Sequence, residues 1–489
     1  MRKKRILLPI FSFFIFLTSV AQDKWDLRRC VEYAWQNNID VRLADVNARM
    51  AAIDLEQSRW ETRPVIGLNT NIGLQFGRSI DPNTNQFTSG SSMLLYNSFN
   101  LQGNIDFFAW GRLKNAVISY QYSHQSALAN VDKVKNDVAL NVATAYLTAL
   151  LNHQQAEIAR VTMEQSRYQL ILTRRKVDAG SLPEIDALTF ETQYTTDSAN
   201  YIGAMATAQQ SLLSLKALLN LDAAQPFEIE TPPVDNIPIE PLLQLQPELV
   251  FETALNNQPA QKQIALQIKS AEAMYKSRKA LFYPTFSLFG SLASQFSSSD
   301  RKITGYQFLG YSPADPLSPI VNVGGVAYPV LSPNVDLQEG KKTFSEMWDG
   351  WGRQIDNSFR QAIGLSIQVP IMQRGFARLS IKTSKLQLEN LSIQRQQVDQ
   401  TLKNNIYTAF YQATAALQKY NATVKSVETA QKSYDFALKR FDMGLLNAFE
   451  LLNTQNNLTR AKLDNLYAQF DYVFKMKVLE FWKGLGIRL

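Results

Sequence analysis

The sequence predicts a mainly α-helical protein with a smaller membrane-crossing β component, built by tandem duplication of one unit. Residues 112–179 and 376–443 each form a stretch of 68 positions without Gly or Pro. Such stretches are far longer than an ordinary globular helix. Four further segments of ten or more residues alternate between apolar and polar side chains, which is the period of a β-strand. The spacing of apolar residues in the long helices also fits an ordinary coiled coil.

The duplication is visible in gapless alignment of the two halves. Moving residues 112–179 by 264 positions places Thr144-Ala145-Tyr146 on Thr408-Ala409-Phe410. Moving the preceding helix by 220 positions places Pro64 on Pro284. Fixed internal repeats indicate one structural unit used twice. We therefore predict a first repeat at 22–221, a Pro-rich connector at 222–246 and a second repeat at 247–489.

Each repeat is predicted to have the same order of elements: a helix, two strands, a long helix and a returning helix. The first repeat reads as helix 25–62, strands 64–77 and 97–110, long helix 112–179 and return helix 183–221. The second reads as helix 247–281, strands 282–297 and 356–370, long helix 376–443 and return helix 446–483.

The N-terminus is typical of a secretory signal peptide at 1–21. The basic segment MRKKR precedes the apolar segment ILLPIFSFFIFL, and small residues follow at Ser19-Val20-Ala21. We expect cleavage before Gln22; an uncleaved anchor is the alternative. Without the four basic residues of the signal, the net charge falls from +7 to +3, so charge does not indicate a nucleic-acid partner.

The single cysteine, Cys30, excludes an intrachain disulfide. A lipid anchor at this cysteine is the alternative to a buried helix residue. Because Arg28-Arg29 precedes it, the sequence does not match a lipobox. We expect Cys30 to be buried in a helix.

The alternating segments alone fit a half-buried sheet of a soluble protein as well as membrane strands. Their length, the signal peptide and aromatic residues at their ends favour the membrane. These girdle aromatics are Trp110, Tyr283, Trp348 and Trp351. Four strands cannot close a barrel, and an open sheet edge cannot face lipid. The protomer must therefore share a barrel with copies of itself, with 8 strands from two copies or 12 from three.

The two long helices end in the same way, as RKVDAGSLPEIDAL (175–188) and KRFDMGLLNAFELL (439–452). Asp178 and Gly180 match Asp442 and Gly444 and predict two tight turns with Gly at the helix C′ position. An acid follows each Gly by six positions, at Asp186 and at Glu450. Either acid could simply complement the positive end of the returning helix.

With its duplicated order of elements, two long helices, two D-x-G turns and the loop GRSIDPNTNQF (77–87), the chain resembles TolC-type outer-membrane efflux proteins over residues 24–489. The resemblance implies a trimer with a 12-stranded shared β-barrel in the cell outer membrane, to which each protomer gives four strands. It also implies an α-helical barrel in the periplasm, with the connector in an equatorial belt.

The resemblance further implies a function without chemistry. The trimer would be the outer-membrane channel of a tripartite efflux or type I secretion system, passing small toxic compounds or proteins outward through a tunnel gated at its periplasmic tip. Its partners would be outer-membrane lipid, a periplasmic adaptor (membrane fusion) protein and an inner-membrane RND or ABC-type transporter.

For the site, the resemblance implies that Asp186 and Glu450 of three protomers place six carboxylates around the periplasmic constriction. We also expect Phe441 to narrow this pore, although packing is the alternative role for its ring. The chain departs from relatives that carry Arg two positions past the second tip Gly, since Leu446 stands there and Leu182 stands in the first repeat. Relatives with a second acid have it where this chain has Thr189 and Asn453. A long second hairpin segment, 298–354, is expected to lie over the outer mouth.

No enzyme, metal or cofactor signature is present in the sequence. The only histidines, His124 and His153, are 29 residues apart, and no metal-binding, phosphate-binding or nucleophile motif occurs. The alternative from another class is a periplasmic coiled-coil adaptor or a trimeric surface stalk without a pore. An adaptor would need one helical hairpin and a membrane anchor, whereas this chain predicts two hairpins and long strands.

Overall fold

The structure, a computed structural model, describes residues 24–78, 80, 87, 93–231, 240–298, 301–313 and 319–484. The chain divides into two units, which we name by their content. The helical unit comprises residues up to Leu55, Ile118–Ala273 and the residues from Thr383 onward, and the sheet unit comprises Glu56–Val117 and Met274–Lys382. The predicted signal peptide lies outside the described residues.

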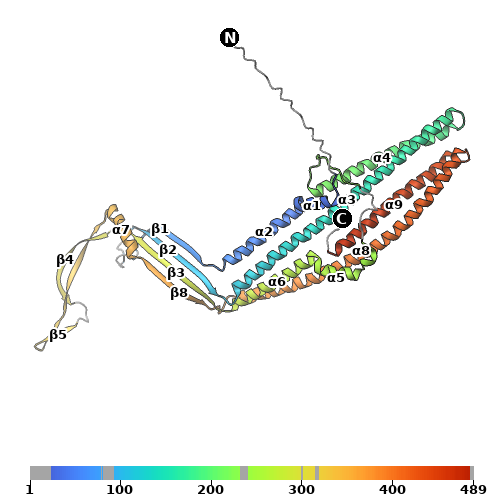
Figure 1. Cartoon of the computed structure of the whole chain (residues 1–489). Coiled ribbons are helices and arrows are strands. Elements are labelled where there is room, and N and C mark those ends of the chain that lie inside the picture. The colour runs from blue at the N-terminus through green and yellow to red at the C-terminus, as the bar shows by residue number, and fades with distance from the viewer. Residues whose placement is uncertain are drawn as a thin grey trace, which may run out of the picture. The chain divides into compact units, whose positions relative to one another are not determined.

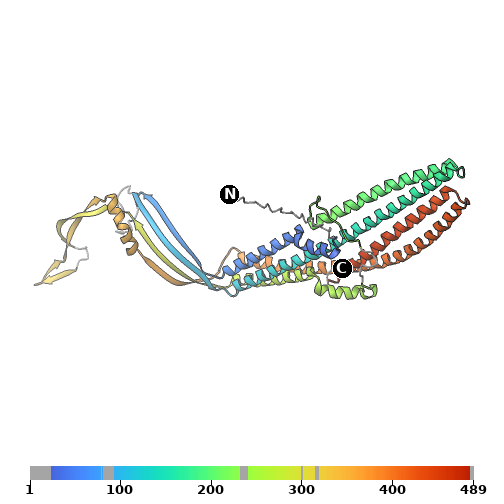
Figure 2. The same ribbon diagram turned by 45° about the horizontal axis from the view of Figure 1, so that its top comes forward.

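Two helical hairpins make up most of the helical unit, and Figure 1 shows the two helices of each hairpin side by side. In the first hairpin, α3 (Arg112–Asp178) returns as α4 (Glu184–Leu219). In the second, α8 (Phe376–Asp442) returns as α9 (Ala448–Trp482). The turns of the two hairpins lie next to each other (Figure 2). Both α3 and α8 contain 67 residues, about 100 Å of helix at 1.5 Å per residue.

The helix predicted at 25–62 is two helices, α1 (Leu27–Asn37) and α2 (Ile39–Trp60). Asn38 separates them: its amide Nδ2 donates to Leu218 O at 2.8 Å, and its Oδ1 accepts from Asp40 N at 2.9 Å. These bonds satisfy one backbone group at the start of α2 and one at the end of α4, both of which helix ends leave open.

The second repeat breaks at the equivalent position, 220 residues later. The helix predicted at 247–281 is α5 (Pro247–Asn257) and α6 (Pro259–Lys279), followed by a 3₁₀ turn, η3 (Ala280–Phe282). Gln258 lies at the break, and its Nε2 donates to the carbonyls of Phe481 and Trp482 at 3.0 and 3.1 Å. The polar side chain at each break caps the C-terminal end of a neighbouring helix, α4 or α9. The hydrophobic pattern could not indicate these contacts.

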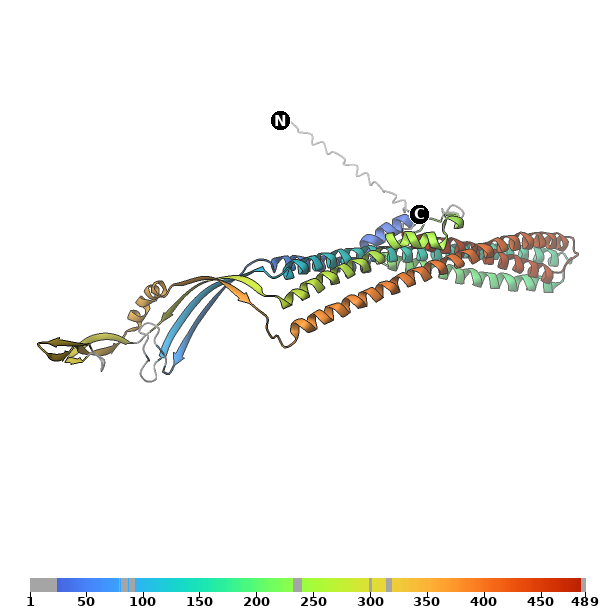
Figure 3. The same ribbon diagram turned by 90° about the horizontal axis from the view of Figure 1, so that it is seen from below.

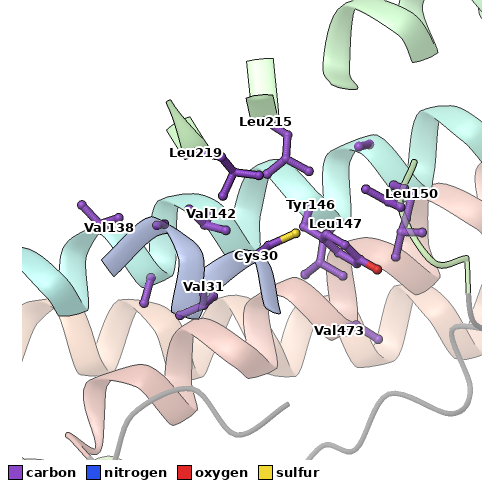
Figure 4. Close-up of a cluster of buried hydrophobic side chains, with 14 of the residues drawn as sticks. Cys30, Val31, Val138, Val142, Tyr146, Leu147, Leu150, Leu215, Leu219 and Val473 are labelled. Atoms are coloured by element: carbon purple, nitrogen blue, oxygen red, sulfur yellow. The ribbon is translucent and has the colours of Figure 1, made fainter. Parts of the chain in front are cut away.

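The main core of the helical unit forms where α1 packs between α3, α4 and α9, and Figure 4 shows Cys30 among these side chains. Burial raises the pKa of the Cys30 thiol to about 12. The connector joins this core through Trp25, whose N donates to Glu228 O at 3.0 Å and whose ring contacts Phe227. Further along the connector, η2 (Leu242–Gln244) leads to a second core around Leu245.

The sheet unit contains one four-stranded antiparallel sheet, in the order β1-β2-β3-β8 (Figure 3). The strands are β1 (Val65–Phe76), β2 (Met93–Phe108), β3 (Thr285–Ser297) and β8 (Arg360–Gln368). Compared with the predicted 97–110, β2 begins four residues earlier, and β8 is shorter than the predicted 356–370. Ser287, for example, faces Asp106 on one side and Ser366 on the other.

The segment predicted as a loop at 298–354 is largely ordered secondary structure. It contains the ribbon β4 (Arg301–Pro313) with β7 (Leu331–Lys341), the smaller ribbon β5 (Ile320–Val323) with β6 (Val326–Pro329), and the helix α7 (Phe344–Asn357). A capping box begins α7: Glu346 N and Thr343 Oγ1 are 3.5 Å apart, and Thr343 N donates to Glu346 Oε2 at 2.7 Å. The ribbons and the helix were not predicted because the segment is rich in Pro, Gly and Ser, which are typical of turns and loops.

Candidate functional site

The two hairpin turns, here called the tip, have the same backbone hydrogen bonds. In the first turn, Gly180 N donates to Val177 O at 2.7 Å and Ser181 N donates to Lys176 O at 2.8 Å. In the second, Gly444 N donates to Phe441 O at 3.0 Å and Leu445 N donates to Arg440 O at 2.9 Å. This pair of bonds defines a Schellman motif.

Glycine is required at both turns because the backbone enters the left-handed region. The φ angle is +73° at Gly180 and +71° at Gly444. Asp178 and Asp442 are the last helical residues before these turns and are exposed. The repeated sequence thus encodes the same helix ending twice.

The two predicted acids lie in the first turns of the returning helices. Asp186 is half-buried in α4, and its N donates to Pro183 O at 3.1 Å. Glu450 is exposed in α9, and its N donates to the side chain of Asn447 at 2.8 Å. Neither carboxylate forms an ion pair with a side chain that the structure describes. Both carboxylates therefore remain available to face a pore or solvent.

Phe441 packs inside the tip rather than on its surface. Its side chain is 5% exposed in the single chain, and its ring contacts Phe190 of the other hairpin edge-on, with centroids 6.0 Å apart. Side chains of both hairpins together bury this position. Packing, the alternative role, thus accounts for the ring within one chain. A part for Phe441 in the constriction stays a prediction.

Polar contacts also join the hairpins around this core. Lys176 Nζ lies 3.7 Å from Asp442 Oδ1 and 5.3 Å from the centroid of the Phe441 ring. Arg174 pairs with Glu191 within the first hairpin at 2.7 Å. These ion pairs are largely exposed and contribute little stability. The apolar contacts therefore dominate the joint between the hairpins.

The two leucines at which this chain departs from Arg-bearing relatives belong to that apolar joint. Leu182 and Leu446 are partly buried against the cluster that contains Phe190 and Phe441. Burial raises the pKa of the Tyr434 hydroxyl in the same cluster, so this hydroxyl stays protonated at neutral pH. At Leu182 and Leu446 the tip is thus held by hydrophobic packing and not by a charged side chain.

Buried polar side chains that the sequence did not predict lie beside the tip core. Ser166 donates to Asp197, and Asp197 accepts from Gln193 Nε2 at 2.9 Å. Gln455 on α9 is 2% exposed, and neither its Nε2 nor its Oε1 has a partner in the described chain. A buried amide without partners destabilises the packed arrangement. Polar residues at the apolar period of the hairpins were the available signal.

The register of the sheet gives it one mainly apolar face and one mainly polar face. Leu68 pairs with Leu101, which pairs with Leu292, and Leu288 pairs with Leu365. The apolar face is formed by Ile66, Leu68, Ile72, Leu74, Phe76, Phe99, Leu101, Ile105, Phe286, Leu288, Leu292, Phe296, Ile363, Leu365 and Ile367. The opposite, mainly polar face carries Asn69, Asn71, Gln75, Asn100, Gln102, Asn104, Ser287, Ser291, Gln295, Arg360, Ser366 and Gln368.

Most of the apolar face is exposed in the single chain, with Ile363 82% exposed as its extreme. Soluble monomers rarely expose so large a contiguous apolar surface. The outer edges of β1 and β8 have no strand partner among the described residues. An exposed apolar face and open strand edges are typical of a sheet that pairs or packs with something beyond the single chain.

The predicted girdle aromatics form two separate groups in the sheet unit. Trp110 and Tyr283 lie at the strand ends next to the helices, with ring centroids 5.0 Å apart, and Trp110 Nε1 donates to Pro284 O at 3.0 Å. Trp348 and Trp351 stack on α7 with centroids 6.2 Å apart. The second pair lies on a helix and not at a strand end, which the sequence analysis did not foresee.

An internal contact between the repeats is a second feature that the sequence analysis missed. In the helical unit, α6 packs on α3 through Ser270 and Ser119, whose hydroxyls lie 3.1 Å apart and each donate to the other's carbonyl. Two helical turns along the same pair of helices, Ser126 Oγ donates to Gln263 O at 3.3 Å.

Among the described residues, the repeat-equivalent faces have no such contact. Positions 43 and 50 of α2 correspond to Gln263 and Ser270, and positions 383 and 390 of α8 correspond to Ser119 and Ser126. Leu43 and Met50 are 60% and 52% exposed. They belong to a heptad-spaced row of exposed apolar residues on α2: Ile39, Leu43, Val46, Met50 and Ile53. That spacing was a signal available in the sequence.

The described residues contain no cluster of three or more potential metal-ligating side chains. Within the same residues, no helix has the length and apolar character needed to cross a membrane.

Comparisons with known proteins identify the relatives of this chain. The family model described as "Outer membrane efflux protein" matches residues 31–221 and 327–473. The probable outer membrane lipoprotein SilC of Salmonella typhimurium is 21% identical over 355 residues, covering 72% of this chain and 74% of SilC. The alkaline protease secretion protein AprF of Pseudomonas aeruginosa is 18% identical over 351 residues, covering 71% of this chain and 62% of AprF. Among solved structures, CusC superposes with a TM-score of 0.71 at 15% identity, over 94% of this chain and 92% of CusC.

Proposed function

Because the chain belongs to the outer membrane efflux protein family, we propose that it forms the outer-membrane channel of a tripartite efflux or type I secretion system. In this proposal three protomers build one continuous tunnel from the periplasm to the exterior. The similarity to the outer membrane lipoprotein SilC supports the location, the similarity to the secretion protein AprF supports an export role, and the likeness to CusC supports the fold.

The single observation that carries the proposal is the four-stranded sheet with an exposed apolar face and two unpaired edges. In lipid, the edge groups of β1 and β8 must find hydrogen-bond partners, because no water is present to replace them. Pairing β8 of one protomer with β1 of the next satisfies both edges at once. Three copies give 12 strands, with the apolar face toward lipid and the polar face toward the lumen.

The helical unit supports the same closure through its repeat symmetry. Within the chain, α6 packs on α3 through Ser270 and Ser119. The equivalent faces, around Met50 on α2 and Thr383 on α8, are both exposed. If α2 of one protomer packs on α8 of the next in the same way, every protomer uses each face once. Such a head-to-tail contact closes into a ring when the rotation between neighbours brings the third copy back to the first.

The tip would form the gate of the tunnel. Three copies of Asp186 and Glu450 would place six carboxylates around its narrow end, and a ring of acids favours cations. The apolar joint of Phe190 and Phe441 would hold the hairpins of each protomer together. A periplasmic adaptor and an inner-membrane RND or ABC-type transporter would supply the cargo and the energy, and the channel itself would catalyse no reaction.

A cysteine cross-link tests the proposed ring. In a Cys30→Ala background, Met50→Cys with Thr383→Cys should form disulfide-linked dimers and trimers on mild oxidation of outer-membrane fractions. The matched control, Asp45→Cys with Thr383→Cys, moves the first cysteine to another side of α2 and should stay monomeric on denaturing gels. Cross-linking by both pairs, or by neither, would contradict this arrangement.

Conductance and fractionation separate the channel from a periplasmic adaptor or surface stalk. The purified channel should insert into planar bilayers as a heat-resistant oligomer and conduct ions with cation preference. An adaptor or stalk would leave the membrane fraction under mild extraction and give no conductance. Absence of ion flow from correctly cross-linked trimers would refute the channel function while leaving the ring intact.

A further inference from the structure

The short helix α7 packs on the apolar face of the sheet, at the end where the strands do not continue into helices. The Trp351 ring meets Phe99 edge-on, with centroids 6.3 Å apart, and Phe99 belongs to the apolar face. Ser294 Oγ donates to Ile355 O of α7, and Gln354 Oε1 accepts from Ser297 N at 2.9 Å. Beneath α7, Ser294 and Phe296 are buried, whereas most of the apolar face is exposed.

The exposed surface of α7 is divided in chemistry. Trp348 is 57% exposed and stacks on the partly covered Trp351. Glu346, Arg353 and Asp356 are exposed polar residues of the same helix. Lys302 at the base of the β4–β7 ribbon pairs with Glu346 at 2.6 Å, which ties the ribbon to the start of the helix.

We infer that α7 is an amphipathic helix lying in the headgroup region of the outer leaflet, with Trp348 and Trp351 as its lipid anchors; this inference rests on the proposed function. If the apolar face of the sheet is the outside of a barrel, a helix on that face lies outside the barrel, where the surroundings are lipid. The charged residues of α7 exclude the hydrocarbon region. The interface, where indole rings are favoured and charges remain hydrated, satisfies both groups.

The vertical position of α7 agrees with the thickness of an outer membrane. From Phe286, beside the Trp110–Tyr283 pair, to Ser294 beneath α7, β3 rises about 26 Å at about 3.3 Å per residue. At a barrel tilt of about 40° this gives about 20 Å of height, and an interfacial helix extends about 5–10 Å into the boundary. The two aromatic groups therefore bracket an apolar band close to the expected height of about 25 Å.

A second copy of the chain is the competing occupant of the exposed Trp348 surface. The proposed barrel joins neighbours through the edges of β1 and β8, whereas α7 contacts β3 in the middle of the face. A neighbour that reached α7 would therefore have to do so across the lipid-facing surface. This geometry favours lipid.

Spin labels test the inference in the full-length trimer reconstituted in phospholipid vesicles. In a Cys30→Ala background, single cysteines replace Trp348 and Arg353, two positions on different sides of α7, and carry a nitroxide. Accessibility to oxygen, which concentrates in lipid, and to a water-soluble nickel chelate is measured for each. The label at 348 should show a severalfold higher oxygen-to-nickel ratio than the label at 353.

A reference pair on β8 separates failure of this inference from failure of the proposed function. Leu365→Cys lies on the apolar face and Ser366→Cys on the polar face. If the label at 365 reports lipid but those at 348 and 353 are equally open to nickel, α7 does not lie in the membrane and the inference is overturned. If the label at 365 is itself open to nickel, the proposed orientation of the sheet fails. Strong immobilisation at 348 with access to neither reagent would indicate a second copy and would also overturn the inference.

Discussion

An arginine at the centre of the apolar face should destabilise the membrane form far more than one on the polar face. Ile363 pairs with Gly290, midway between the two aromatic groups, and is 82% exposed in the single chain. The neighbouring Ala362 pairs with Ser291 on the polar face. Ile363→Arg and Ala362→Arg therefore place the same charge at the same height on opposite sides of one strand. Gly364 is unsuitable as the control, because an added Cβ would lie 2.7 Å from the Phe289 ring.

The expected size follows from the energy of a charge facing lipid. Arg on the lipid face of a barrel costs about 2–4 kcal/mol at the bilayer midplane. Three protomers would then lose about 6–12 kcal/mol per trimer for Ile363→Arg. A substitution on the solvated lumen face usually changes stability by about 0.5 kcal/mol or less.

Urea titration of folding into lipid vesicles, read as the fraction of heat-resistant trimer on gels, measures this difference. Ile363→Arg should lower the midpoint strongly or abolish the trimer band, and Ala362→Arg should fold like the unmodified protein. Equal effects of the two substitutions, or a larger effect of Ala362→Arg, would refute the assignment of the apolar face to lipid.

Three further results are expected. Gln455→Leu removes a buried amide without partners and should stabilise the packed tip by about 1–3 kcal/mol, raising the melting temperature followed by circular dichroism; a lower melting temperature would show that the amide is satisfied in the assembly. Burial raises the pKa of the Cys30 thiol to about 12, whereas the unfolded thiol ionises near pH 8.5, so Cys30 should react with iodoacetamide at pH 9 only after unfolding. The contribution of this neutral thiol to stability is complete below about pH 8.5 and is lost as the pH rises toward 12. Rapid labelling of the folded protein would contradict the burial of Cys30. Asp186→Asn with Glu450→Gln should reduce cation preference and divalent block in single-channel recordings, whereas the mid-helix control Glu428→Gln should not; unchanged block would remove the acid ring from the proposal.

The sequence predicted those elements whose physics is local and periodic. The absence of breakers in α3 and α8, the D-x-G turns and the alternation of β1 and β8 each depend on neighbours a few residues apart. Membership of the outer membrane efflux protein family, expected from the order of these elements, is confirmed by the family match.

The remaining features depend on contacts between distant parts of the chain. The breaks at Asn38 and Gln258 are stabilised by carbonyls about 180 and 220 residues away. The packing of Phe441 could not be predicted because its partner, Phe190, comes from the other repeat. The helix α7 was overlooked because its flanking segment is rich in turn residues, although the pattern of Thr343 and Glu346 at its start was readable as a capping box.

The two repeats differ in chemistry where the proposed ring would require them to differ. The contact within the chain, between Ser270 and Ser119, is polar, and its partners are already held near each other by the polypeptide. A contact between protomers must also overcome the loss of translational and rotational freedom, about 4–15 kcal/mol. Apolar burial can supply this free energy at about 25 cal/mol per Å², whereas exchanging hydrogen bonds with water supplies little. At the equivalent positions of the first repeat stand Met50 and Leu43, both exposed and apolar. Replacing Met50 and Leu43 with the Ser and Gln of the second repeat should therefore weaken assembly without unfolding the protomer, and an unchanged trimer would place the joint elsewhere.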